Sequence, residues 1–193
     1  MSEVEFFDLT YDESEYSLSD EAFETALIGT YQRVFNQSPY RENFDYQLAE
    51  EIIQGIETSD TEGVVAVDYG IPVGFAWGEV LQPKDQGDFP DEVPEIFFDG
   101  EAYYFAELGV LPSYRDQGIG KELKKRELQE VMQREDLDKG LMRTSIEENE
   151  KKLGLDNDLG FRPLERDGEI VTEEVDTVGR DDSDLRGYFW RRL

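Results

Sequence analysis

The chain of 193 residues has the length of one ordinary domain and is long enough to enclose a hydrophobic core. Its 19 Lys and Arg oppose 47 Asp and Glu, and the formal net charge of -28 argues against a nucleic-acid binder, which needs a basic face for phosphates. The absence of Cys and His excludes disulfides, thiolate nucleophiles, metal sites built from these residues, and an imidazole acid or base, so no metal site is expected.

The first half of the chain predicts a strand, two helices and a hairpin. Residues 3–9 are expected to form the strand. A helix follows from Asp20, where apolar residues recur at steps of three and four and Ser19 or Asp20 is available as N-cap. The same period predicts a second helix over 44–56. Alternation then predicts paired strands at 64–67 and 71–77, joined by a turn around 68–70.

The second half begins with an acidic loop over 82–100, which contains three prolines. A strand is expected at 102–111 and a helix from Gly118 to about Glu135. Glu127 interrupts the apolar stripe of this helix, so either its exposed edge bends there or the register is off by a turn. The remaining elements are a strand at 141–146, a short helix within 149–159, and strands at 169–178 and 185–192.

This order of elements predicts one mixed α/β domain over residues 1–193, built around one mostly antiparallel sheet. No segment approaches the roughly 18 apolar residues of a spanning helix, and the first residues lack a basic leader region. We therefore expect a soluble, cytoplasmic protein that does not associate with membranes.

The acidic residues are spread along the whole chain. This pattern is typical of cytosolic proteins of extreme halophiles, because the Debye length is only about 3 Å at molar salt and dense like charge is then screened. The alternative interpretation is that the negative surface attracts a cationic substrate.

Residues 108–123 carry the most informative motif. A strand ends at Pro112, a turn follows with Gly118 and Gly120, and a helix begins there. Such a turn directs backbone N–H groups at a helix N-terminus toward solvent, where a phosphate is favoured, and glycine lets the phosphate approach closely. Residues 115–126 carry a net charge of +3, whereas the other 181 residues carry -31. A polyanionic ligand is therefore expected here.

The pattern Arg115-x-x-Gly118-x-Gly120 after Val110-x-Pro112 resembles the acetyl-CoA signature of the GNAT N-acetyltransferase superfamily. The resemblance continues downstream, where a strand, Asn149, a short helix and a Gly-Phe pair follow in the family's order. It implies a GNAT-like acyl-CoA N-acyltransferase fold, with acetyl-CoA as cosubstrate.

The resemblance also implies roles for individual residues. Backbone amides from Gln117 to Lys121 would hold the pyrophosphate, and Arg115 would flank it. The main chain of Leu108 and Val110 would bind the pantetheine arm, and the Val110 amide would also polarise the thioester carbonyl. The full set implied for the cofactor is Leu108, Val110, Arg115, Asp116, Gln117, Gly118, Ile119, Gly120, Lys121 and Asn149.

The family reaction is direct attack of an amine on the thioester, which agrees with the lack of Cys and His. Glu107, just before Leu108, is the candidate general base. At the position where the family often has a tyrosine that acts as the general acid, this chain has Asp156. The coenzyme thiolate would then leave unassisted, through water, or with a proton from Tyr114 or Tyr188.

The acceptor implied is a small-molecule or peptide amine. One alternative is a catalytically degenerate acyl-CoA-binding or sensing module, or a partner subunit in an enzyme. Another is a dimeric scaffold without enzymatic activity. The closing strand at 188–192 is a candidate for pairing across a homodimer, although an edge strand within one chain has the same sequence pattern.

Overall fold

The structure is a computed structural model that describes residues 4–9, 20–38, 40–56, 61–146, 157–179 and 182–193. The chain forms two compact units that interleave along the sequence. The first unit contains Met1–Gly78 and Glu107–Gln129, and the second contains Glu79–Ala106 and Glu130–Leu193. Among the described residues, no helix is both long enough and apolar enough to span a membrane.

The strands of the first unit follow the order β1, β2, β3, β4. Their bounds are Glu5–Asp8, Thr61–Asp68, Ile71–Val80 and Ala102–Val110, and the last four residues of β4, 107–110, lie in this unit. β1 pairs antiparallel with β2, from Glu5 opposite Val67 to Asp8 opposite Val64. The β2–β3 hairpin turns at Tyr69 and Gly70, both with positive φ, which is the geometry of a tight two-residue turn.

Helices α1 (Glu21–Phe35) and α2 (Tyr46–Gly55) begin where the sequence supplies aspartate caps. The Asp20 Oδ1 accepts hydrogen bonds from the amides of Ala22 and Phe23, at 2.8 and 3.1 Å. Asp45 caps α2 in the same way through the amide of Leu48. These caps stabilise amides that lack a partner inside the helix, so both helix starts are locally encoded.

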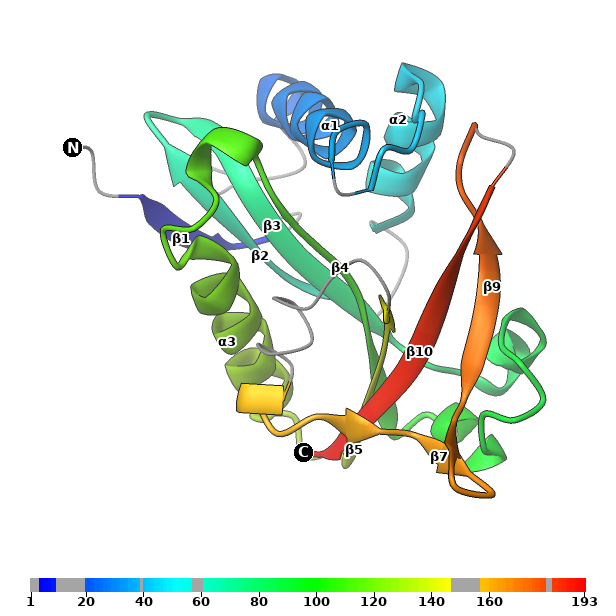
Figure 1. Cartoon of the computed structure of the whole chain (residues 1–193). Helices are drawn as coiled ribbons and strands as arrows, with labels where there is room; N and C mark the ends of the chain where they lie inside the picture. The colour runs from blue at the N-terminus through cyan, green and yellow to red at the C-terminus, as the bar shows by residue number, and fades with distance from the viewer. Residues whose placement is uncertain (1–3, 10–19, 39, 57–60, 147–156, 180–181) are drawn as a thin grey trace. The chain divides into compact units, whose positions relative to one another are not determined.

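The third helix, α3 (Ile119–Val131), and helix α1 pack on opposite faces of β3, as the ribbon in Figure 1 shows. Phe75 on β3 stacks with Tyr31 of α1. A Cβ added to the neighbouring Gly74 would instead lie 3.1 Å from the Leu123 side chain of α3. Successive residues of a strand face opposite sides of the sheet. The large side chain at 75 therefore packs against α1, and the absence of a side chain at 74 lets α3 approach β3 closely.

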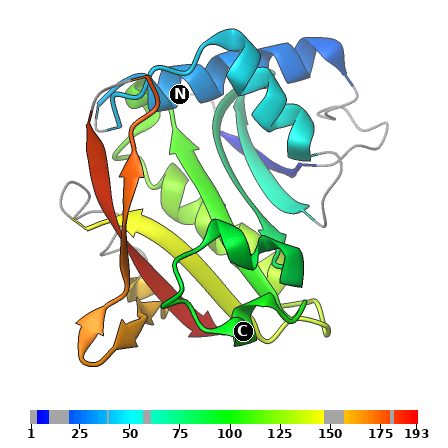
Figure 2. The same ribbon diagram turned by 90° about the vertical axis from the view of Figure 1, so that its right-hand side faces the viewer.

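The strands of the second unit follow the order β4, β5, β10, β6, and β9 also pairs with β10 (Figure 2). The bounds are Lys139–Ser145 for β5, Arg162–Pro163 for β6, Thr172–Asp176 for β9 and Ser183–Arg192 for β10. β4 and β5 pair in parallel from Ala102 opposite Lys139 to Phe105 opposite Met142, whereas β10 pairs antiparallel with its neighbours. The expected mixed α/β class is confirmed.

The acidic loop contributes two short 3-10 helices, Pro83–Asp88 and Glu95–Phe98. Phe97 and Phe98 are buried in a cluster with Leu141 of β5 and Tyr188 of β10, and Phe89 packs against the same cluster. The loop therefore supplies aromatic side chains to the core of the second unit, although its acidic composition suggests only a surface connection.

Three predicted elements differ from those observed. The third helix ends at Val131 rather than near Glu135. The amides of Gln133 and Arg134 donate hydrogen bonds to the carbonyls three residues before them, which closes a turn in place of a further α-helical turn. The strand expected at 169–178 is divided into β8 (Glu169–Ile170) and β9, because β8 forms a small hairpin with β7 (Glu165–Arg166). The expected short helix within 149–159 lies mostly outside the described residues.

The closing strand is correctly predicted, but it is not an edge strand. β10 pairs with β5 over Arg186–Arg192, with β9 over Ser183–Gly187, and with β6 at Phe189 and Trp190. Its backbone is therefore engaged within the chain, which removes the basis for pairing across a homodimer through residues 188–192.

Candidate active site

The motif of residues 108–123 folds as a strand, a turn and a helix, as predicted. After β4 ends at Val110, a 3-10 turn spans Pro112–Tyr114 and α3 begins at Ile119. Asp116 and Gly118 have φ values of 61° and 83°, in the left-handed region. Glycine carries this conformation without strain, so Gly118 is suited to turn the chain into the helix.

The N-terminus of α3 has room for a ligand at its glycines. The first amides of an α-helix have no partner within it, and they carry partial positive charge. A Cβ added to Gly118 would meet no atom within 4 Å, and one added to Gly120 would meet only Val110 Cγ2, at 3.6 Å. The backbone at both positions is therefore open to close approach by a phosphate.

The peptide groups at the end of β4 alternate in direction. The Leu111 amide donates to the Val73 carbonyl of β3, at 2.9 Å. Because successive residues of a strand direct their peptide groups to opposite sides, the peptide groups of Leu108 and Val110 point away from β3. The pairing of β4 with β5 ends at Phe105, before either residue. These are the two residues whose main chain the sequence assigns to the pantetheine arm.

Arg115 binds backbone carbonyls in this structure. Its Nε donates to the Val110 carbonyl at 2.9 Å, and its Nη1 donates to the Ser38 carbonyl after α1. The Nη2 atom is shielded from solvent and has no hydrogen-bond partner among the described residues. The guanidinium therefore connects the end of β4 to the segment after α1, and its contact with phosphates stays a prediction.

The basic residues near the turn are less available than their sequence suggests. Lys124 is buried beside Glu127, with 3.6 Å between Nζ and Oε2, and Arg126 pairs with Glu122 at 2.8 Å. Lys121 is exposed. The local charge of +3 thus includes cations already matched by carboxylates, and the N-terminal amides of α3 become more important for binding an anion.

The other residues assigned to the cofactor differ in exposure. Asp116 and Gln117 are exposed, and the Gln117 side chain donates to the Ser113 carbonyl at 3.2 Å. Ile119 is largely buried, at 6% exposure. Asn149, and the position of Asp156, lie outside the described residues.

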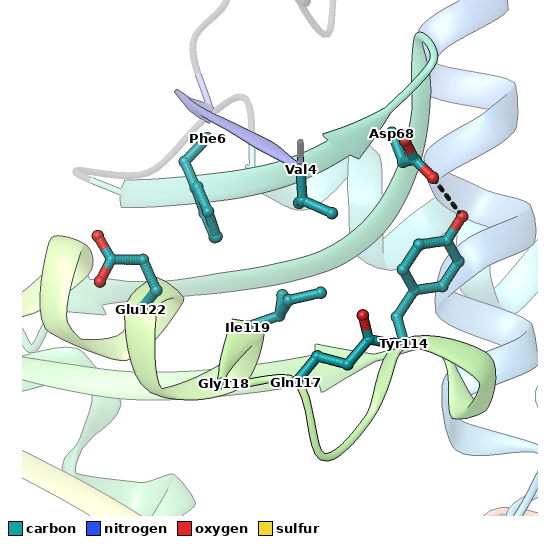
Figure 3. A pocket seen from close by; sticks show the side chains of 8 residues that line it. All are labelled: Val4, Phe6, Asp68, Tyr114, Gln117, Gly118, Ile119 and Glu122. Carbon is teal, nitrogen blue, oxygen red and sulfur yellow. Dashed lines mark hydrogen bonds between the residues drawn. The ribbon is translucent and has the colours of Figure 1, made fainter. Parts of the chain in front are cut away.

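A cavity of about 500 Å³ borders the turn on the β1 side (Figure 3). Val4, Phe6 and Ile119 give it apolar walls, and the carboxylates of Asp68 and Glu122 line it as well. Two carboxylates disfavour a polyanion in this cavity. A phosphate ligand of the turn is therefore expected outside it.

The sequence offered two tyrosines as proton donors, and both are held by carboxylates. Tyr114 donates to Asp68 Oδ2 at 2.7 Å, and this bond raises the pKa of the Tyr114 phenol (Figure 3). Tyr188 donates to Glu173 Oε2 at 2.8 Å, and burial together with this bond raises the pKa of Tyr188. Each phenol is thus a weaker acid than free tyrosine, which disfavours both as the donor to a thiolate.

Glu107, the candidate base, lies on β4 within the first unit and is half-buried. The Tyr31 hydroxyl of α1 donates to its Oε1 at 3.5 Å. The sequence gave no sign of this contact, because the two residues lie 76 positions apart.

Comparisons with known proteins bear on the family and the fold. A model of the acetyltransferase (GNAT) family matches residues 20–161. No curated protein matches the chain. Among solved structures, the ribosomal-protein-S18-alanine N-acetyltransferase of Escherichia coli is similar at a TM-score of 0.65 and 12% identity, covering 98% of this chain and 94% of that one.

Two further structures are similar. The ribosomal-protein-alanine N-acetyltransferase of Brucella melitensis has a TM-score of 0.64 and 19% identity, covering 90% of this chain and 96% of that one. A putative acetyltransferase of Salmonella typhimurium, solved with its cofactor acetyl-CoA, has a TM-score of 0.66 and 13% identity, covering 100% of this chain and 95% of that one. The TM-scores of 0.64 to 0.66 show a common fold, and the expected GNAT-like α/β fold is confirmed.

Proposed function

Because the chain belongs to the GNAT acetyltransferase family, we propose that it transfers an acetyl group from acetyl-CoA directly to an amine. The observation that carries this proposal is the turn from β4 to α3. It combines the open glycine backbone at the start of α3 with peptide groups of β4 that point away from β3. Acetyl-CoA supplies an activated thioester, whose acyl carbon forms a bond with the amine nitrogen while its bond to sulfur breaks.

The backbone of the turn is proposed to bind the cosubstrate. Amides from Gln117 to Lys121 donate to the pyrophosphate, and Leu108 and Val110 offer strand-like hydrogen bonds to the pantetheine arm. The Val110 N–H also donates to the thioester oxygen, where negative charge develops during attack. A fixed backbone donor of this kind stabilises the transition state more than the ground state.

Glu107 is proposed to act as the general base. An alkyl amine is protonated near neutral pH, so a proton must leave before its nitrogen can attack. The Glu107 carboxylate accepts this proton directly or through one water. The chain contains no Cys or His that would offer a covalent or imidazole route.

The proposed acceptor is a small-molecule or peptide amine. Two of the similar structures are named as ribosomal-protein-alanine N-acetyltransferases, which supports including peptide α-amines among the candidates. The aspartates and glutamates that give the chain its net charge of -28 are also compatible with cationic acceptors such as polyamines.

The first prediction tests activity by release of free thiol from acetyl-CoA, in the presence of peptide α-amines, lysine peptides, polyamines or amino acids. The protein has no cysteine, so every thiol detected belongs to coenzyme A. We expect turnover with at least one amine class. Glu107→Gln should lower kcat roughly 10²- to 10⁴-fold, the usual contribution of a general base, and leave acetyl-CoA affinity unchanged.

The matched control is Glu135→Gln, which makes the same charge change at an exposed carboxylate. It should keep wild-type turnover. Tight acetyl-CoA binding without turnover on any amine would favour the acyl-CoA-binding module instead. Full activity of Glu107→Gln would remove this residue from the mechanism.

A further inference from the structure

The Tyr31 phenol places a hydrogen-bond donor beside the proposed base. Tyr31 is 1% exposed, and its hydroxyl lies 3.5 Å from Glu107 Oε1. A buried hydroxyl needs a polar partner, and a carboxylate is a strong acceptor for it. The contact therefore links the interior of α1 to one oxygen of the base.

The Tyr31 ring is fixed from several sides by uncharged aromatic residues. It stacks with Phe75 and Trp77 of β3, at centroid distances of 5.6 and 5.9 Å. Phe35 of α1 and Phe44 before α2 lie 4.6 and 5.2 Å from it. The phenol oxygen consequently has little freedom to move, because the ring that carries it is locked by packing.

The direction of Glu107 follows from the backbone. Residues 107 and 109 face the same side of β4, since side chains alternate along a strand. A Cβ added to Gly109 would lie 2.9 Å from Val34 Cγ1 on α1, so this is the side that α1 covers. Tyr31 precedes Val34 by one helical turn and thus lies on the same face of α1.

We propose that Tyr31 is a positioning residue, which holds Glu107 in the ionised state and in the orientation that lets it accept the proton of the acceptor amine. This inference rests on the proposed function. The hydrogen bond to Oε1 favours the carboxylate over the carboxylic acid and restricts rotation of the side chain.

The second prediction concerns Tyr31→Phe, which keeps the ring and removes the hydroxyl. We expect kcat to fall about tenfold, with the KM for acetyl-CoA unchanged. The acidic limb of the pH profile of kcat/KM should move up by about one pH unit, because the carboxylate loses a donor that stabilises its charged form; one such unit corresponds to a tenfold change in proton affinity.

A direct titration makes the test independent of turnover. Carboxyl carbons of labelled glutamate are followed by NMR, and the Glu107 signal is assigned by its loss in Glu107→Gln. Its titration midpoint should rise in Tyr31→Phe. The matched control, Tyr69→Phe, removes a hydroxyl from a residue that is 85% exposed on the β2–β3 turn, and it should change neither the midpoint nor kcat.

A second variant leaves the packing of α1 intact. Glu107→Asp keeps the carboxylate but withdraws it from the phenol by one methylene, so its kcat should also fall. Tyr31→Phe should then have no additional effect in the Glu107→Asp background, because the contact is already lost.

The outcomes separate this inference from the proposed function. If Glu107→Gln lowers kcat as predicted but Tyr31→Phe shifts neither the pH profile nor the NMR midpoint, the positioning role of Tyr31 is wrong and the role of Glu107 as general base is kept. If Glu107→Gln is fully active, the base and its positioning residue are both wrong.

Discussion

Glu127 illustrates how packing changes the meaning of one residue. In the sequence it interrupts an apolar stripe, which suggested a bent helix edge or a shifted register. In the structure it is fully buried beside Lys124 in α3, an arrangement that neither explanation includes. Two charges buried together offset part of each other's desolvation, whereas removing one partner leaves an unmatched charge, so the pair must be considered as a unit.

The third prediction belongs to Tyr188. Burial and the hydrogen bond to Glu173 raise its pKa, so the folded state holds this proton more tightly than the unfolded state does. Its contribution to stability is therefore fully present below the ordinary tyrosine pKa, near 10, and is lost as pH rises through the raised value. Above about pH 10 the free energy of unfolding should fall by about 1.4 kcal/mol per pH unit for this one proton.

Urea unfolding at pH 8, 10 and 11 measures this dependence. Tyr188→Phe should remove one proton's share of the slope above pH 10. At neutral pH, Glu173 keeps its ion pair with Arg143, at 2.7 Å, so the variant is expected to fold. Tyr46→Phe, at an exposed residue, should keep the wild-type slope. Equal slopes in the wild type and Tyr188→Phe would contradict the assignment.

At the scale of elements, the turn between β4 and α3 carries the proposed binding of acetyl-CoA. The fourth prediction is that Gly118→Val raises the dissociation constant for acetyl-CoA at least tenfold. The φ of 83° strains a β-branched residue, at a cost of roughly 1–3 kcal/mol, and the new side chain would occupy the open space before the amides of α3. Calorimetric binding and urea unfolding measure the two effects separately.

Two variants distinguish strain from obstruction. Gly118→Asn tolerates positive φ better, so it should lose less stability while still weakening acetyl-CoA binding. Gly29→Ala adds a methyl group to the middle of α1, where the added Cβ meets nothing within 4 Å, and should leave binding unchanged. Wild-type affinity in Gly118→Val would place the phosphates elsewhere.

At the scale of the whole molecule, the net charge of -28 sets the response to salt. The fifth prediction is that the thermal midpoint rises from 0.1 to 2 M KCl, because screening over about 3 Å at molar salt weakens repulsion among carboxylates. Differential scanning calorimetry measures it, and sucrose of equal osmolality controls for non-ionic effects. If the midpoint is unchanged while the KM for a cationic acceptor rises with salt, the negative surface instead attracts substrate.

The elements of this protein were predictable where their causes are local. Asp20 and Asp45 cap their helices within three residues, and the φ > 0 turn at Tyr69 and Gly70 closes the β2–β3 hairpin. The division of the predicted strand at 169–178 was not predictable, because β8 exists through its pairing with β7. Strand pairing depends on a partner that periodicity within one segment does not reveal.

The candidate site also combines features with local causes and features that depend on packing. The strand, the glycine turn and the helix that form it are consecutive in the chain, and the sequence by itself determined them, because backbone conformation responds to neighbours a few positions away. Only the tertiary structure decided that Tyr31 contacts Glu107, that Tyr114 contacts Asp68, and that Arg115 binds backbone carbonyls. The two tyrosine contacts join residues 76 and 46 positions apart, and such proximity arises only when helices and strands pack together.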